Sequence, residues 1–245
     1  MALSPQTPDT SVASVSSVCW FPVLAAMLAI MCMVPAIARA QVKIPPAPSP
    51  IGIRAYAIAF EWQRMTASET FDAVTGSSSL IGFGGGVEVL RIAKGIFARL
   101  AISLMTAEGT RVAISGDEVV AFDPPIRLNV SLLPVEVGGG WRFSPRPRPG
   151  VPSPRVTPYV GASGLFVRYR ETSEFDEPGE DAAITFNGIA FFGGVDVGLG
   201  GGIFIGGEAQ YRIVPDALGE GGASAFFGET DLGGLALRVL IGFRR

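Results

Sequence analysis

From residue 56 onward, apolar side chains recur at every second position, and glycine, alanine and isolated charges fill the positions between them. This period of two is that of a β-strand, whose successive side chains point to opposite faces of a sheet. Beyond Ala40, no run approaches the roughly 18 continuous apolar residues that a membrane-spanning helix needs. The pattern therefore predicts an all-β protein in which each strand has one bulky apolar face.

Eight segments show the alternation, and long polar connections alternate with shorter turns between them. This order is typical of an exported up-and-down barrel with long outer loops and short periplasmic turns. The connection over 144–157 is longer than the other turns, so it is read either as a turn or as a domain boundary. Pro134 is expected to mark a bulge, because proline cannot donate to a strand ladder. The segments are 56–62, 83–89, 96–104, 135–141, 159–169, 191–199, 205–211 and 235–243.

Charged residues on the small-residue face distinguish a membrane barrel from a soluble sandwich. A sandwich would place lysine, threonine, serine and glutamine on its solvated face, whereas glycine, alanine and isolated charges suit the narrow interior of a barrel. Buried charges must be paired, so we expect these residues to form an ion network inside the barrel. They are Glu61, Glu88, Arg99, Glu136, Arg168, Asp196, Glu208 and Arg238.

Aromatic residues near the ends of the segments predict two membrane-interface girdles. Tyr159 and Tyr169 lie ten residues apart in one segment, which projects to about 25 Å along the membrane normal, the height of the apolar band of such barrels. Packing in a core is the alternative for each aromatic residue taken alone. Trp62, Tyr169 and Tyr211 are assigned to one girdle, and Trp141, Tyr159 and Phe243 to the other.

The first forty residues have the pattern of an export signal. An apolar run from about Val18 to Ala38 precedes Ala38-Arg39-Ala40, a small-x-small site that a signal peptidase would cut. The run is also long enough for an uncleaved anchor, and the segment before it lacks lysine and arginine, as a misplaced start codon would explain. The expected organisation is a signal peptide over 1–40, a proline-rich lead-in over 41–50 and a barrel over 51–245.

The chain resembles the small bacterial outer-membrane β-barrel proteins related to the OmpA transmembrane domain and to OmpX. The resemblance is carried by the residues at 158–162, 207–212 and 235–243, and it covers about residues 51–245. It implies an eight-stranded antiparallel up-and-down transmembrane barrel in the outer membrane. Members of this family usually end on an aromatic residue that the insertion machinery recognises, whereas here Arg244 and Arg245 follow Phe243.

The composition excludes several chemistries. The chain has no histidine, and its two cysteines, Cys19 and Cys32, precede the predicted cleavage site. A histidine-based hydrolase, a zinc or copper site and a cofactor are therefore not expected. The acidic stretch 171–181 could offer oxygen ligands to calcium but lacks the spacing of a calcium loop, so a solvated outer loop is preferred. No basic groove with interleaved aromatic residues predicts nucleic-acid binding.

These features predict a non-enzymatic outer-membrane protein with a role in envelope structure, adhesion or recognition. Its expected partners are outer-membrane lipids, lipopolysaccharide and the insertion machinery, and the sequence specifies no surface ligand. About eight strands leave an interior just filled by side chains, so no open channel is expected. The alternative is a small porin-like transport or ligand-binding barrel, and a soluble periplasmic sandwich is a third reading.

Overall fold

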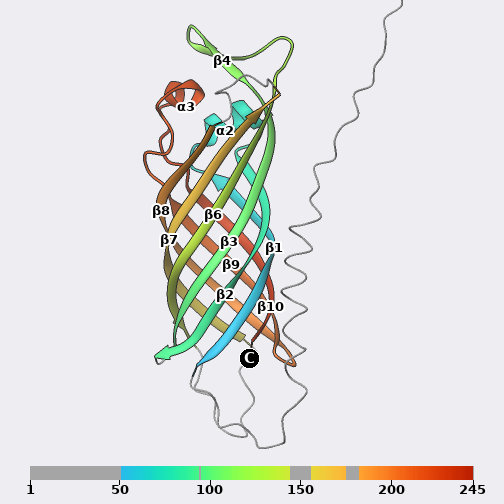
Figure 1. Cartoon of the computed structure of the whole chain (residues 1–245), viewed down its shortest axis with the longest axis vertical. Helices are drawn as coiled ribbons and strands as arrows, with labels where there is room; N and C mark the ends of the chain where they lie inside the picture. Colours follow the sequence, from blue (N-terminus) through green and yellow to red (C-terminus); the bar gives the residue numbers. More distant parts are fainter. Residues whose placement is uncertain (1–50, 94, 144–155, 175–181, 245) are drawn as a thin grey trace, which may run out of the picture. The chain divides into compact units, whose positions relative to one another are not determined.

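The computed structural model describes residues 51–93, 95–143, 156–174 and 182–244, and within them eight antiparallel strands close into a barrel (Figure 1). The closed order is β1-β10-β9-β8-β7-β6-β3-β2. Every one of the eight predicted segments lies in one of these strands, which confirms the predicted fold class. The strands are β1 (Gly52–Met65), β2 (Ser79–Ala93), β3 (Ile96–Thr110), β6 (Arg127–Arg142), β7 (Val156–Ser173), β8 (Ala182–Gly200), β9 (Ile203–Ile213) and β10 (Gly234–Arg244).

The predicted signal peptide and the proline-rich lead-in lie outside the described residues. So does most of the 144–157 connection and of the acidic stretch 171–181. No described helix is long and apolar enough to cross a membrane.

A β-bulge in β1 changes which of its residues face the interior. Ile58 pairs with Leu240 and Phe60 pairs with Val239, so Ala59 is the extra residue. Before the bulge Ile58 faces inward, and after it Phe60 faces outward. The alternation of 56–62 in the sequence predicts that Tyr56 and Ile58 share the outer face of Phe60. This prediction is wrong, because an inserted residue reverses the alternation of a strand.

The bulge expected at Pro134 does not form. Leu133, Pro134 and Val135 pair in unbroken register with Arg168, Val167 and Phe166 of β7.

The loop end of the barrel carries short elements that the periodicity did not predict. Two helices lie there, α2 (Ser68–Thr75) and α3 (Gly222–Phe227), together with a hairpin of β4 (Val112–Ser115) and β5 (Glu118–Ala121). Figure 1 shows α2 at the mouth of the barrel and the hairpin beyond it. The barrel wall is also uneven at the loop end. Strand β8 begins at Ala182, but its pairing with β9 begins only at Ile189, so 182–188 extend beyond the end of β9.

Helix α2 closes the loop-end mouth with an apolar plug. Phe71 is 4% exposed and packs in one buried cluster with Met105, Leu132 and Leu165 of the barrel wall. Both carboxylate oxygens of Glu229, from the connection between α3 and β10, accept hydrogen bonds from the first turn of α2, at 3.1 Å from the Glu69 nitrogen and 2.8 Å from the Thr70 nitrogen. A carboxylate is favourable at this end of a helix because the free N–H groups there need acceptors.

The packing of α2 against β3 depends on Gly109. A Cβ atom at this position would lie 2.3 Å from the carbonyl oxygen of Val74 in α2. Since real Cβ atoms do not approach so closely, a larger residue would force the helix away from the strand.

Substituting Gly109 by valine is expected to displace α2 and to cost about 1–3 kcal/mol of unfolding free energy, the usual range for overpacking. Cleavage by a soluble protease within 66–78 should become faster, while the barrel remains closed. The matched control is Gly207→Val, because a Cβ at Gly207 meets no atom within 4 Å. Equal protease resistance of the Gly109→Val variant and the unsubstituted protein would contradict the assignment of Gly109.

Candidate functional site: the barrel interior and the outer surface

At the turn end of the interior, two arginines and two carboxylates form a closed ring of ion pairs. Arg54 lies 2.7 Å from Glu88 and 2.7 Å from Asp196 through its two terminal nitrogens. Arg142 contacts the same two acids, with 2.6 Å to Glu88. Each carboxylate therefore bridges both guanidinium groups, and the four side chains come from four different strands.

A second ion cluster occupies the middle of the barrel. Arg99 binds Glu208 through both terminal nitrogens, at 2.7 and 2.8 Å. Arg238 lies at the centre and contacts Glu208 at 3.3 Å, Glu61 at 3.2 Å and Glu136. Charge-assisted and bidentate contacts of this kind are the strongest hydrogen bonds in proteins.

Arg212 extends the central cluster toward the loop end. It lies 2.5 Å from Glu61 and 3.2 Å from Glu136. Its Nε donates to Gln210 at 2.7 Å, and Gln210 in turn donates to Glu136 at 2.9 Å. Polar side chains thus extend the ion network up to the level where the apolar plug begins.

The buried charges of the described barrel balance. Five arginines and five carboxylates lie inside, so the interior carries no net charge. Burying an ion is costly unless an opposite charge compensates for it, and removing one partner of a buried pair typically costs about 3–5 kcal/mol. Neutrality is therefore a condition for this interior to be stable. The ten residues are Arg54, Glu61, Glu88, Arg99, Glu136, Arg142, Asp196, Glu208, Arg212 and Arg238.

Aromatic rings pack against the guanidinium groups of the network. The Cζ atom of Arg54 lies 3.9 Å from the ring centroid of Phe204, and that of Arg99 lies 4.3 Å from the centroid of Phe192. The Cζ atom of Arg142 lies 4.6 Å from the ring centroid of Tyr159. The hydroxyl of Tyr159 donates a hydrogen bond to Glu208 at 2.9 Å. Such cation–π contacts stabilise arginine where water is excluded.

Seven of the eight residues predicted for the interior network lie inside, and Arg168 does not. Arg168 is exposed on the outer face of β7, whereas Tyr159, Leu165 and Val167 of that strand face inward. The assignment failed because the bulky face of β7 packs against the apolar plug. In the loop-end half of the barrel, bulky side chains can face inward because the apolar plug fills the interior there.

Three interior arginines, Arg54, Arg142 and Arg212, were not predicted. Arg142 lies at an even spacing from Glu136 in β6, and Arg212 lies at an even spacing from Glu208 in β9, so the alternation alone could have found both. The predicted interior also contained five acids and only three arginines, and this imbalance indicated that further interior cations were missing from the prediction. Arg54 could not be found in this way, because the bulge at Ala59 separates it from Glu61.

Four of the six predicted girdle residues lie on the outer face. Trp62 and Tyr211 are near the loop end, and Trp141 and Phe243 are near the turn end. The other two predictions are wrong. Tyr159 is 1% exposed within the ion network, and Tyr169 is partly buried against the apolar plug. Tyr169 errs for the reason given for Arg168. Tyr159 lies nearer the turn end and faces inward because it packs with Phe97 and Phe192 beside the ion network.

The outer surface of the barrel is apolar on every strand. Exposed side chains include Phe60, Val137 and Leu237, which are 45%, 54% and 46% exposed. On β7 the outer residues from Val156 to Phe166 carry no charge, and ten residues of a tilted strand span about 25 Å along the barrel axis. A water-soluble protein rarely exposes an apolar surface of this extent.

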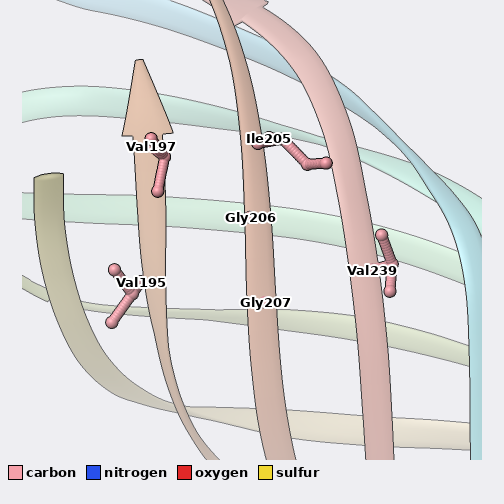
Figure 2. Close-up of a pocket in the computed structure, with 6 residues that line it drawn as sticks. All are labelled: Val195, Val197, Ile205, Gly206, Gly207 and Val239. Carbon is pink, nitrogen blue, oxygen red and sulfur yellow. The ribbon is translucent and has the colours of Figure 1, made fainter. Parts of the chain in front are cut away.

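A shallow hollow of about 240 Å³ interrupts this surface where Gly207 has no side chain (Figure 2). Its walls are valines and an isoleucine of β8, β9 and β10. An apolar hollow on an apolar face suits hydrocarbon and offers no group for chemistry. Among the described residues, no group of three histidine, cysteine or acidic side chains is arranged to hold a metal ion.

No protein-family model matches the sequence, and no curated protein matches it. The chain is similar to solved structures of small outer-membrane proteins. Ail, the attachment invasion locus protein of Yersinia pestis, is 13% identical over 79% of this chain and 99% of its own, with a TM-score of 0.46. The outer-membrane protein OprG of Pseudomonas aeruginosa is 13% identical over 80% and 95%, also at 0.46. Neisserial surface protein A is 13% identical over 80% of this chain and 96% of its own, with a TM-score of 0.42.

Removing one central arginine should destabilise the barrel strongly. Arg238→Met leaves Glu61 and Glu136 short of a buried cation, so we expect a loss of about 3–5 kcal/mol in the free energy of unfolding. The measurement is reversible urea unfolding in lipid vesicles. Arg168→Met is the matched control, because this arginine is exposed and should cost about 0.5 kcal/mol or less. Equal losses in the two variants would show that the interior network is not what holds the barrel together.

The pair of Arg99 and Glu208 should show strong coupling. Each single substitution by leucine leaves an uncompensated charge inside, whereas the double variant restores neutrality. The double variant is therefore expected to be less destabilised than the sum of the single variants, by about 1–3 kcal/mol. Additive losses in the same unfolding assay would contradict the requirement for a neutral interior.

Proposed function

We propose that the chain is an integral outer-membrane β-barrel protein with a closed interior and a non-enzymatic role in envelope structure, adhesion or recognition. The observation that carries this proposal is the inverted distribution of side chains. The outer face is apolar around the whole barrel, and the centre holds ten mutually neutralising charges. A soluble barrel would have the opposite arrangement.

The closed sheet supports the same conclusion. Within hydrocarbon, every backbone N–H and C=O group has to be satisfied by the protein itself. The barrel meets this requirement because its first strand, β1, pairs with its last, β10, from Arg54 to Met65. Among the described strands each pairs with both neighbours in the closed order, and β8 extends beyond its β9 partner only in its loop-end part before Ile189.

The filled interior supports a closed barrel in preference to a small porin-like one. A transport pore would need a water-filled path along the axis. The path here meets the ring of Arg54, Glu88, Arg142 and Asp196 at the turn end and the apolar plug around Phe71 at the loop end.

The distribution of surface charge supports a role for the loops. After residue 50, every acidic residue outside the interior lies in the loop-end connections or the strand ends beside them, between Glu69 and Asp231. The turn-end connections contain basic residues and no acids. Loops on a rigid scaffold are where proteins carry recognition, so the acidic loops are proposed to face the exterior and to meet surface ligands. Membrane lipids, lipopolysaccharide and the insertion machinery are the other proposed partners, the last through Phe243 in the final strand.

Two measurements on the full-length protein test this proposal. The refolded protein should require detergent or lipid for solubility, and its gel mobility should change on boiling, because a closed barrel resists unfolding by detergent. Planar-bilayer recordings should show no large, stable conductance. A soluble, monomeric product without detergent would contradict the membrane assignment, and a steady open channel would favour the porin-like alternative.

A further inference from the structure

The hairpin of β4 and β5 is a small sheet of its own at the loop end. Its two strands form a sheet separate from the barrel, and Figure 1 shows the hairpin beyond the mouth of the barrel. A two-residue turn of Gly116 and Asp117 joins the strands, and the φ angle of Gly116 is +65°. Glycine adopts such an angle without strain, so the turn suits a tight hairpin.

One edge of this small sheet is open. Helix α3 lies beside β4, whereas β5 has no strand on its other side within the described ranges. The turn closes where Ser115 lies opposite Glu118, and residues of an antiparallel pair alternate between exchanging hydrogen bonds and pointing them outward. The backbone N–H and C=O groups of Val119 and Ala121 therefore point away from β4, where they can pair with another strand.

The open edge lacks the usual protection against pairing. Edge strands that must stay unpaired commonly carry lysine, proline or a bulge. None of these interrupts β5 between Glu118 and Ala121, and its register with β4 is regular. The side chains around this edge are also apolar, since Val120 is 38% and Phe122 is 41% exposed. An exposed apolar strand edge in an outer loop indicates a surface for a partner.

Acidic residues lie at both ends of this apolar edge. Asp117 and Glu118 precede Val119, and Asp123 follows Phe122. All three acidic residues are exposed. A strand that pairs with β5 would therefore have apolar neighbours along its middle and carboxylates near each of its ends.

The described connections around the hairpin have the same sign of charge. The loop-end connections over 66–78, 111–126 and 214–233 contain nine acids and one arginine. Such an excess of one sign steers an oppositely charged partner toward the surface. The acids are Glu69, Asp72, Asp117, Glu118, Asp123, Asp216, Glu220, Glu229 and Asp231.

We propose that β5 binds a partner protein by adding an extended segment of it to the hairpin as a third strand. The segment that fits has about four apolar residues flanked on each side by basic residues. Main-chain hydrogen bonds to the open edge provide affinity in this mode of recognition, and the flanking charges provide specificity. The site rests on the proposed exterior location of the loops and goes beyond it, because it names the edge and the chemistry of the partner.

The probe is a synthetic octapeptide, blocked at both ends, with four valines between two pairs of lysines. It is titrated into the full-length protein in zwitterionic micelles, and amide exchange is followed residue by residue by nuclear magnetic resonance. Exchange at Val119 and Ala121 should slow on binding, because their N–H groups point outward. Exchange at Val120 should change less, because this residue already pairs with Ala113 across the hairpin.

Val119→Pro separates the edge from the side chain. Proline removes an outward N–H group without removing a bond to β4, so binding should weaken about fivefold or more, as expected for one lost hydrogen bond. Val119→Ala is the matched control, because it keeps the N–H group and should change binding by about twofold or less. If Val119→Pro disrupts the hairpin, Ala121→Pro removes the other outward N–H group and is compared in its place.

The flanking charges have their own controls. Asp117→Asn combined with Glu118→Gln should weaken binding about fivefold at low ionic strength and less at high ionic strength. Glu69→Gln combined with Asp72→Asn removes the same charge from α2 and should have a smaller effect. An octapeptide with glutamates in place of the lysines, and one with methylated valine nitrogens, should both bind poorly.

Several results would overturn the site. They are unchanged exchange at Val119 and Ala121 on peptide binding, equal binding by the proline and alanine variants, or tight binding of the methylated peptide. Dimerisation without peptide that Val119→Pro abolishes would assign the edge to a second copy of this chain. Attachment to phospholipid vesicles that persists in the proline variants would assign the hairpin to a lipid surface. Heat-dependent gel mobility, recorded for every variant, separates these results from failure of the membrane assignment.

Discussion

The neutralisation of charge inside the barrel is the condition on which the rest of the structure depends. Five guanidinium groups and five carboxylates lie within a narrow closed sheet, and each arginine contacts at least one carboxylate. Because the opposite charges pair with one another at the centre, the outer face is free to be apolar on all strands. Small inner residues make room for this arrangement. A Cβ at Gly194, for example, would lie 2.5 Å from the hydroxyl of Tyr159.

The interior changes character along its axis. Ion pairs and aromatic rings fill the turn-end half and the middle, and an apolar plug built around Phe71 of α2 fills the loop end. The plug is held by contacts between connections that are distant in sequence, since Glu229 caps a helix that begins at Ser68. The described interior is therefore filled in two different ways along its axis, and this filling is the basis on which we propose a closed barrel.

The number of strands, their locations and most of the interior charges could be predicted, because alternation is a local property of each strand. The inner and outer faces of β1 and β7 could not. In β1 the extra residue Ala59 reverses the alternation without any sequence signal, and in β7 the bulky residues face an apolar plug that only tertiary contacts create. The exposed position of Arg168 follows from the same contacts. Helices α2 and α3 were missed because short elements held by distant partners leave little periodicity.

The most direct test of this account is a scan of spin labels along β10, in the full-length chain with Cys19 and Cys32 replaced by serine. Labels at Leu235, Leu237 and Val239, in protein embedded in lipid vesicles, should be accessible to oxygen dissolved in the hydrocarbon and shielded from a water-soluble nickel reagent. Labels at the intervening Ala236 should be accessible to neither. If the label at Leu237 were instead relaxed by the nickel reagent as strongly as one in an outer loop, the apolar face would lie in water and the inside-out arrangement would be refuted.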